Sequence, residues 1–292
     1  MNDLVSTGWL AERLGEPGLV VIDASAHLPD AGRDARAEFA AAHIRGARFL
    51  DLETLKDADS PVPAALPTAA QFAARMAEIG VSDGDRVVIY DDSGVKTSAR
   101  AWFIFRLHGV REVALLDGGL GKWRAEGRPL ESGAPGDQQG RFTAANGPGT
   151  VRSKAEVLAN IASGEEQLVD ARGAGRFTGA EPEFRPGMPS GHIPGSRNLP
   201  FGGVLNPDGT FMDEAGLREA FANVGIDLDR PVVTTCGSGV TAAVLLFALH
   251  LLGKDDVALY DGSWSDWGAD PDTPKATGPA VRAPPPPQPR LP

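Results

Sequence analysis

Short apolar runs, each followed by a polar or Gly-rich turn and then by a longer helix-compatible stretch, recur along the chain. The runs are four or five residues long and rich in β-branched residues, which is typical of buried strands. Strands that alternate with helices favour a parallel sheet that is covered on both faces. The pattern therefore predicts an α/β fold with mostly parallel sheets flanked by helices.

In the first half of the chain, the predicted strands are the apolar runs at residues 19–23, 86–90 and 113–116, with a possible short strand at 49–52. Helices are predicted within residues 34–43, at 69–80 and from about 98 to 107. The second of these helices should end at Gly80, because glycine is common just after a helix C-terminus. Residues 60–67 are rich in proline and predict a loop.

The pattern breaks once and then restarts. Residues 131–150 are rich in Gly, Pro, Gln and Ala without an apolar period, which predicts a linker. We therefore expect a first domain over residues 1–130 and a second over residues 151–272. Residues 273–292 include four consecutive prolines, and we expect them to form a disordered tail with local polyproline II character.

The second half repeats the first. The His-Ile-Pro-Gly segment at His192 corresponds to the His-Ile-Arg-Gly segment at His43, 149 residues earlier. Trp267 corresponds to Trp123, 144 residues earlier, so the offset drifts little between these positions. Self-similarity of this kind predicts two copies of one α/β domain.

The only cysteine stands in Cys236-Gly237-Ser238-Gly239-Val240-Thr241, which we call the Cys236 loop. A β-branched run at 231–235 precedes it, and a nearly all-apolar stretch at 242–252, followed by Gly253, comes after it. This predicts a tight strand-to-helix turn, in which the glycines let backbone N–H groups converge and the helix dipole points at the same place. A thiol held there should be partly thiolate at neutral pH and therefore nucleophilic. A lone cysteine can also be a small buried apolar residue, but the glycines and the helix start favour the reactive interpretation.

Only one of the two copies carries this nucleophile. On the repeat alignment, Cys236 lies opposite Asp91, and Ser238 lies opposite Ser93. The first domain is therefore predicted to be non-catalytic.

Composition and charge narrow the functional classes. The 292 residues, with 42% hydrophobic and 23% charged residues, are ordinary for about two globular domains. The formal net charge of -11 argues against a general nucleic-acid or anionic-membrane binder. A single cysteine fits a reducing compartment, the N-terminus shows no signal peptide pattern, and the longest apolar stretch is too short to span a membrane. The expected location is cytoplasmic.

These features resemble the two-domain rhodanese-type sulfurtransferases. The resemblance covers about residues 5–270 and rests on the tandem repeat, the His-Ile-Pro-Gly segments and the Cys236 loop. The loop is most similar to that of the 3-mercaptopyruvate sulfurtransferase branch. The thiosulfate branch carries a basic pair after the cysteine, where this chain has Gly237 and Ser238.

The resemblance also implies two substrate arginines. The segments Asp-Ala-Arg-Gly-Ala-Gly-Arg-Phe, ending at Phe177, and Glu-Pro-Glu-Phe-Arg, ending at Arg185, are similar to those in which the family places them. They map onto Arg176 and Arg185. A guanidinium group suits the carboxylate of a 2-oxo acid, because it is planar, always charged and can bind two oxygens at once.

The implied mechanism passes through a persulfide on Cys236. The thiolate takes the sulfur of 3-mercaptopyruvate and releases pyruvate, and a thiol, cyanide or a thioredoxin-type protein then accepts the sulfur. The N–H groups of Gly237, Gly239, Val240 and Thr241 are expected to bind the donor or the outer sulfur, and Ser238 to donate a hydrogen bond to the leaving fragment. No metal or organic cofactor is implied.

One departure from the family concerns the first domain. The family places an acid there, which maps onto Glu53, and a histidine, which maps onto Ala64. A serine–histidine–acid relay is therefore broken, and the proton should come from water or from the substrate thiol. His43 and His192 are expected to be structural, packing or capping a turn in each copy.

Of three alternatives, a thiosulfate sulfurtransferase and a binding module remain open, whereas the sequence argues strongly against a cysteine phosphatase. A thiosulfate sulfurtransferase would use the same nucleophile with another donor. A cysteine phosphatase of the related fold would need an arginine six residues after the cysteine, and that position is Ala242. A weakly catalytic sulfide-sensing or binding module is slightly favoured by the missing histidine and opposed by the complete loop and both arginines.

Overall fold

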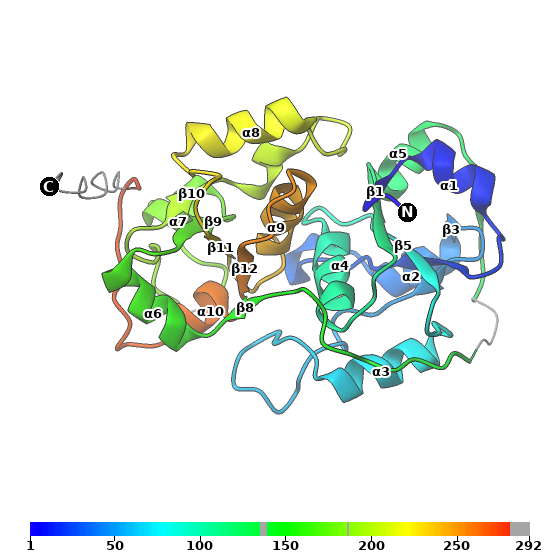
Figure 1. The fold of residues 1–292 in the computed structure, drawn as a ribbon, viewed down its shortest axis with the longest axis horizontal. Coiled ribbons are helices and arrows are strands. Elements are labelled where there is room, and N and C mark those ends of the chain that lie inside the picture. The colour runs from blue at the N-terminus through cyan, green and yellow to red at the C-terminus, as the bar shows by residue number, and fades with distance from the viewer. Residues whose placement is uncertain (135–138, 186, 281–292) are drawn as a thin grey trace, which may run out of the picture.

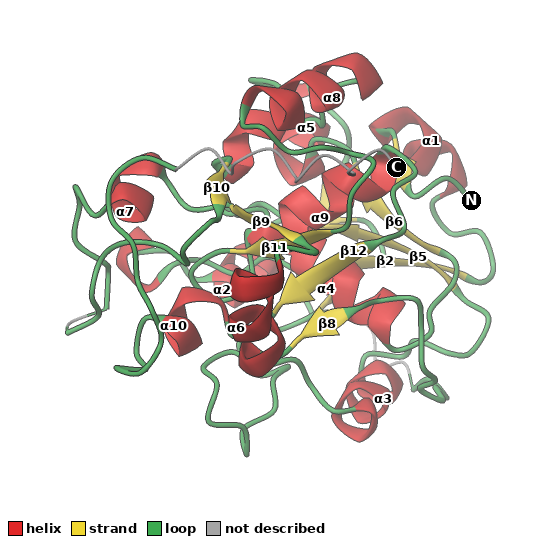
Figure 2. Ribbon diagram, turned by 60° about the vertical axis from the view of Figure 1, so that its left-hand side comes forward, coloured by secondary structure: helices red, strands yellow, loops and turns green. Residues whose placement is uncertain are grey.

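The computed structural model describes residues 1–134, 139–185 and 187–280. It contains two five-stranded parallel sheets, one in each half of the chain, and helices lie on both sides of the strands (Figures 1 and 2). This confirms the predicted α/β architecture of tandem helix-flanked sheets.

The first sheet has the strand order β1-β6-β5-β2-β4. Its strands are β1 (Leu4–Val5), β2 (Leu19–Asp23), β4 (Arg48–Phe49), β5 (Arg86–Tyr90) and β6 (Val113–Leu116). The helices of this half are α1 (Thr7–Arg13), α2 (Ala35–Ala41), α3 (Ala69–Glu78), α4 (Thr97–Leu107) and α5 (Gly119–Ala125), with a 3₁₀ turn η1 (Pro29–Ala31). An antiparallel pair, β3 (His43–Ile44) and β7 (Leu130–Glu131), lies outside the main sheet.

The second sheet has the order β10-β9-β11-β12-β8. Its strands are β8 (Val151–Arg152), β9 (Gln167–Asp170), β10 (Arg197–Asn198), β11 (Val232–Thr235) and β12 (Val257–Tyr260). The helices are α6 (Lys154–Ser163), α7 (Ala174–Thr178), α8 (Glu214–Asn223), α9 (Ala242–Leu251) and α10 (Ser263–Trp267), with a 3₁₀ turn η2 (Phe201–Val204). Read from β8, the order matches that of the first sheet strand for strand, so the topology confirms the repeat.

The predicted strands at 19–23, 86–90 and 113–116 are confirmed with the same bounds. The possible strand at 49–52 is wrong beyond Phe49, because the Asp51 carboxylate accepts the N–H of Glu53 at 3.0 Å and turns the chain. The helix predicted within 34–43 is α2, and the Asp34 side chain caps its start by accepting the N–H of Ala37.

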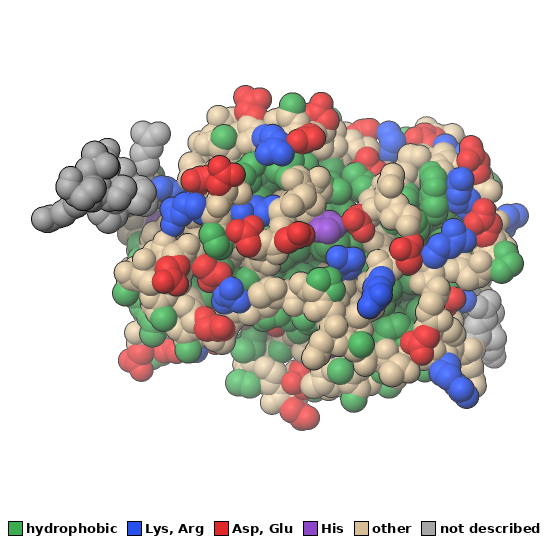
Figure 3. Space-filling model, in the orientation of Figure 1, with side chains coloured by type: hydrophobic (Ala, Val, Ile, Leu, Met, Phe, Trp, Pro, Cys, Tyr) green, Lys and Arg blue, Asp and Glu red, His purple; other side chains and the backbone are tan. Residues whose placement is uncertain are grey.

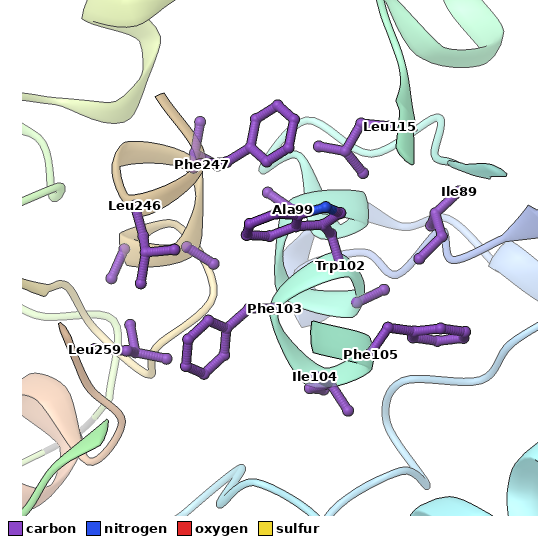
Figure 4. Packing of buried hydrophobic residues seen from close by; sticks show 14 of the residues in the cluster. Ile89, Ala99, Trp102, Phe103, Ile104, Phe105, Leu115, Leu246, Phe247 and Leu259 are labelled. Atoms are coloured by element: carbon purple, nitrogen blue, oxygen red, sulfur yellow. The ribbon is translucent and has the colours of Figure 1, made fainter. Parts of the chain in front are cut away.

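The two halves pack through the pair of helices α4 and α9, which lie side by side at the centre of Figure 1. Trp102 of α4 meets Phe247 of α9 edge to face, with ring centroids 4.8 Å apart. Figure 4 shows Trp102 and Phe103 directed towards α9, whereas Phe105 points back towards Ile89 of the first sheet. Because α4 and α9 are both buried almost throughout, one continuous apolar cluster joins the halves.

The predicted linker is held against the first half. The N–H of Gly147 donates to the carbonyl of Leu107 at 2.9 Å, and the ring of Phe142 meets that of Phe72 edge to face. Among the described residues from 139 to 150 there is no helix or strand. Residues 135–138 of the predicted linker lie outside the described residues.

The prediction of a disordered tail from residue 273 is wrong for its first part. Ala276 exchanges both backbone hydrogen bonds with His192, at 2.8 and 2.9 Å, so this segment is tied to the second half. The four prolines lie in residues 281–292, outside the described residues.

The surface carries charges of both signs. On the face shown in Figure 3, acidic and basic side chains are interspersed, with apolar side chains between them. No helix in the described part of the chain is both long and apolar enough to span a membrane.

Candidate active site

Cys236 lies at the carboxyl end of β11, where the second sheet meets the start of α9. Its side chain is buried, with 2% of the residue exposed. The strand before it and the helix after it match the predicted strand-to-helix turn, and Gly253 follows α9 with φ +74°. The carboxyl edge of a parallel sheet is where α/β proteins commonly bind ligands. The neighbouring strands β9 and β12 deliver further candidate residues to the same edge.

The loop is organised around a residue that the sequence analysis did not single out, Ser263. Its Oγ accepts the N–H of Cys236 at 3.0 Å and that of Gly239 at 3.2 Å, while its own hydroxyl donates to the carbonyl of Tyr260 at 2.9 Å. Ser263 adopts φ +50°, which is uncommon for a non-glycine residue. The corresponding residue in the first half is Gly119, with φ +58°. This comparison between the repeats is the sequence signal that could have found Ser263.

The start of α10 supports the Cys236 loop through hydrogen bonds to its carbonyls. The N–H of Trp264 donates to the carbonyl of Cys236, and the N–H of Ser265 donates to the carbonyl of Gly237, both at 2.9 Å. The Ser265 hydroxyl also donates to the carbonyl of Gly237. Two carbonyls of the loop are therefore bound by the start of α10.

Arg185 contacts Ser265 of α10 directly. Its Nη1 donates to the Oγ of Ser265, although Arg185 lies 80 residues earlier in the chain. The guanidinium is thus one side chain away from the backbone of Gly237. The structure therefore brings the second predicted substrate arginine to the Cys236 loop.

Arg176 also reaches the loop. A Cβ added to Gly237 would lie 4.0 Å from Nη1 of Arg176. Glu183 pairs with Arg176 at 3.6 Å, and the Arg176 guanidinium lies over the exposed ring of Phe184, 4.3 Å from its centroid. One fifth of the Arg176 side chain is exposed, so its guanidinium remains open to an incoming anion.

A third arginine in this region, Arg172, has a structural role. Arg172 is fully buried and binds both oxygens of Asp170, and its Nη1 donates to Glu183 at 2.6 Å. Its pKa is raised by these two carboxylates despite an opposing contribution from burial. Arg172 holds Glu183 through a short ion pair. Because Glu183 contacts Arg176 only at longer range, Arg176 is less constrained.

The other predicted loop residues line the same turn. Ser238 and Thr241 are half-buried, and Thr241 has helical backbone angles at the start of α9 without capping it through its side chain. In the described part of the chain, the N–H groups of Ser238, Val240 and Thr241 make no hydrogen bond, and neither does the Ser238 hydroxyl. These groups, and the N–H of Gly237, are free to bind an anion at the turn. The expectation is wrong for the N–H of Gly239, because it already donates to the Oγ of Ser263 at 3.2 Å.

Two residues of the first half, Ala64 and Arg100, lie near the start of the catalytic half's α10 segment. Ala64 has φ +60°, and its carbonyl accepts from Nη2 of Arg100 at 3.0 Å. Arg100 lies on α4 and also contacts Asp261, which follows β12 of the second half. Glu53 is exposed on the loop after β4. The position onto which the resemblance maps a histidine thus contacts Arg100, which pairs with the second half, and carries only a methyl group.

The two repeated histidines are buried and structural. His43 stacks on Phe39 with ring centroids 4.0 Å apart, and His192 stacks on Phe177 at 3.9 Å. Each shares a hydrogen bond between Nδ1 and the carbonyl of the same phenylalanine, at 2.7 and 2.9 Å. These contacts bear out the predicted packing role in both copies.

Comparison with known proteins agrees with this geometry. The model of the rhodanese-like domain matches residues 6–126 and 153–270, one match in each half. The chain belongs to the rhodanese family.

Among curated relatives of the family, the 3-mercaptopyruvate sulfurtransferase of Mus musculus is 43% identical over 270 residues, covering 90% of this chain and 91% of that protein. The thiosulfate sulfurtransferase of Cricetulus griseus is 40% identical over 289 residues, covering 96% of this chain and 97% of that protein. The crystal structure of SseA from Escherichia coli, described as a 3-mercaptopyruvate sulfotransferase, has a TM-score of 0.82 and 37% identity. It covers 90% of this chain and 99% of its own. Relatives named for two different sulfur donors are therefore similarly close, and the choice of donor depends on the site.

Proposed function

We propose that this rhodanese-family chain transfers sulfur from 3-mercaptopyruvate, through a persulfide on Cys236, to a thiol or cyanide, and releases pyruvate. The observation that carries the proposal is the chain of contacts from Arg185 through Ser265 to Gly237, which sets a guanidinium beside the Cys236 loop. Arg176 approaches Gly237 from the segment that includes α7. A small 2-oxo acid can place its carboxylate on these arginines while its sulfur reaches Cys236.

Thiosulfate is the second candidate donor, because it also carries a transferable sulfur and negative charge. The loop positions that directly follow the cysteine are Gly237 and Ser238, so neither brings a cation to the sulfur. The available cations are the two arginines on the neighbouring segment. This arrangement favours a donor whose anionic group lies some distance from the transferred sulfur, as it does in 3-mercaptopyruvate.

In the first half-reaction, the Cys236 thiolate attacks the sulfur of the donor. The new S–S bond forms as the C–S bond of the donor breaks, and the electron pair of that bond leaves as the enolate of pyruvate. The N–H groups of Ser238, Val240 and Thr241, together with the N-terminus of α9, are placed to stabilise negative charge on the outer sulfur.

The proton balance needs no histidine. The thiol proton of the donor ends on the terminal sulfur of the persulfide, and its transfer to the enolate carbon gives pyruvate and an anionic persulfide. Ala64 stands where the family has its histidine, and Glu53 is exposed on a loop of the first half. Under this proposal, Ser238 orients the donor through its hydroxyl, and Glu53 is not required for proton transfer.

In the second half-reaction, a nucleophile takes the outer sulfur and Cys236 leaves as the thiolate. A small thiol, cyanide or a thioredoxin-type protein fits this step, since each attacks sulfane sulfur. A thiolate that must stay reduced between turnovers suits a reducing compartment, and we propose a cytoplasmic location on that ground. A sensing module is less well supported, since it would not need two arginines beside the thiol.

The donor assignment is tested by comparing the two donors under identical conditions. The experiment measures kcat/KM for pyruvate release from 3-mercaptopyruvate and for sulfite release from thiosulfate, each with cyanide as the acceptor. The proposal predicts the higher value with 3-mercaptopyruvate. A higher value with thiosulfate would overturn the donor assignment while leaving the Cys236 persulfide intact. Adding a thioredoxin system to the first assay tests the protein acceptor.

A further inference from the structure

Arg100 is a buried cation of the first half that reaches into the catalytic half. It lies in the first turns of α4, and only 6% of its side chain is exposed. Its Nη1 pairs with Oδ1 of Asp261 at 2.6 Å, and its Nη2 donates to the carbonyl of Ala64 at 3.0 Å. The short ion pair fixes the guanidinium, because both groups are largely removed from water.

The same guanidinium contacts the Cys236 loop. Nη1 of Arg100 donates to the carbonyl of Gly239 at 3.5 Å. A Cβ added to Gly239 would lie 2.9 Å from that nitrogen and 3.0 Å from two oxygens of Asp261. The close approach and φ +76° together explain why glycine is needed at this position. Gly239 therefore serves the contact with the first half as well as the turn itself.

The contact determines where the next N–H group points. In a planar trans peptide, the carbonyl of one residue and the N–H of the next point in opposite directions. Arg100 holds the carbonyl of Gly239 towards the first half, so the N–H of Val240 is directed to the other side of the peptide. Among the described residues, the Val240 N–H makes no hydrogen bond, so it is free to bind a ligand at the turn.

Asp261 links this contact to the second support of the loop. Its Oδ2 accepts the N–H of Leu66 at 2.9 Å, which fastens the 60–67 loop of the first half. Two residues further on, Ser263 accepts the N–H groups of Cys236 and Gly239. A displaced Asp261 would therefore move both the interdomain contact and the serine that holds the loop.

We propose that Arg100, paired with Asp261, is a positioning residue for sulfur transfer that fixes the Gly239–Val240 peptide so that the Val240 N–H faces the sulfur on Cys236. The inference rests on the proposed function of Cys236. It gives the non-catalytic first half a direct part in the reaction, through one side chain that crosses between the halves.

The repeat supplies a matched control. Asp117, the counterpart of Asp261, accepts the N–H of Phe211 from the opposite half at 2.9 Å. This contact also fastens a loop of one half to the other, but it lies beside the first-half turn of Asp91, which has no cysteine. Asp117→Asn therefore perturbs a similar interdomain contact away from the reaction.

The test compares Arg100→Lys, Asp261→Asn and Asp117→Asn with the full-length wild-type chain. A lysine keeps the charge but cannot contact Asp261 and two carbonyls together. We expect kcat for pyruvate release to fall about tenfold or more in Arg100→Lys and in Asp261→Asn, with KM for 3-mercaptopyruvate changed less than about threefold. With thiosulfate as the donor, kcat should fall by a similar factor, because the sulfur on Cys236 is common to both reactions.

A further variant separates positioning from folding. Arg100→Ala should lose more kcat than Arg100→Lys, and added guanidinium ion at millimolar concentration should restore part of it. A correctly folded Arg100→Lys with wild-type kcat would overturn the inference, and so would an equal loss in Asp117→Asn. If wild-type protein releases no pyruvate from 3-mercaptopyruvate and no sulfite from thiosulfate, the proposed function fails, which is a different result from any change among the variants.

Discussion

Asp91 and Cys236 occupy equivalent turns of the two halves, but only the Asp91 side chain binds N–H groups of its own turn. The Asp91 carboxylate accepts the N–H groups of Ser93 and Ser98, each at 2.8 Å, so the anion-binding groups of its own turn are occupied. In the second half, Ser263 of α10 accepts the N–H groups of Cys236 and Gly239. Among the described residues, the N–H groups of Ser238, Val240 and Thr241 make no hydrogen bond. The equivalent N–H group of Ser93 in the first half is bound by the Asp91 side chain.

Replacing Asp91 should therefore affect stability and leave sulfur transfer intact. Asp91→Ala leaves two N–H groups without partners, and we expect a loss of about 1–3 kcal/mol in the free energy of unfolding. Urea unfolding of the variant measures this loss, and Asp59→Ala on an exposed loop is the control. A large fall in kcat per folded molecule would show that the first turn takes part in the reaction.

Ser263 offers a test of how the active turn is held. Ser263→Ala removes the acceptor for the N–H groups of Cys236 and Gly239, and we expect kcat to fall about tenfold or more. Ser263→Gly should lose a similar amount of kcat. Because glycine tolerates φ +50° better than alanine, Ser263→Gly should unfold at a higher urea concentration than Ser263→Ala. Comparable activity of the glycine variant and the wild type would contradict a role for the hydroxyl.

Replacing a substrate arginine should change KM for the donor, whereas replacing Cys236 should abolish sulfur transfer. Arg185→Ala is expected to raise KM for 3-mercaptopyruvate by about tenfold or more, with a smaller effect on the kinetics with thiosulfate. The reason is that, in the proposed function, Arg185 binds the carboxylate of the 2-oxo acid from its position beside Ser265. Steady-state kinetics with both donors check this, and Arg218→Ala, on the exposed face of α8, is the control. Equal losses with both donors would indicate that Arg185 supports the loop and does not select the donor.

Buried histidines predict a pH dependence of folding. Burial lowers the pKa values of His108 and His192 below the usual value near 6.5. As the pH falls, the unfolded chain therefore binds protons at these positions at a higher pH than the folded protein does. The corresponding stability is fully present above about pH 6.5 and is lost as the pH falls towards the folded-state pKa values.

The measurement is urea unfolding at about pH 7.5 and about pH 5.5. Wild type should be less stable at the lower pH. His192→Gln, which keeps a donor for the Phe177 carbonyl, should show a smaller difference between the two conditions. An unchanged difference in the variant would mean that other groups cause the acid sensitivity.

The sequence allowed the central parts of the site to be predicted because they are local. The Cys236 loop, its preceding strand and α9 follow from short patterns of glycine and apolar residues, and the repeat follows from self-similarity. The arginines came from the family resemblance, and the structure brings both to the loop. The possible strand at 49–52 failed beyond Phe49 because a single side chain, Asp51, turns the backbone.

Ser263 and Arg100 could not be predicted in the same way. Ser263 acts through an unusual backbone angle 27 residues after Cys236, and its local sequence does not require that angle; only its counterpart in the repeat, Gly119, indicates it. Arg100 sits in an apolar helix of the opposite half, where sequence alone gives no partner. Its role depends on how α4 and α9 pack, and packing between distant segments is not encoded in any short pattern.

The persulfide on Cys236 is tested most directly by mass spectrometry of the protein. After incubation with 3-mercaptopyruvate and no acceptor, we expect the added mass of one sulfur atom on the peptide that contains Cys236. Pyruvate should be released in equal amount, and cyanide should then remove the added mass. Cys236→Ser should show neither the added sulfur nor the pyruvate. Wild-type protein that remains unmodified and releases no pyruvate would show that Cys236 does not carry the transferred sulfur.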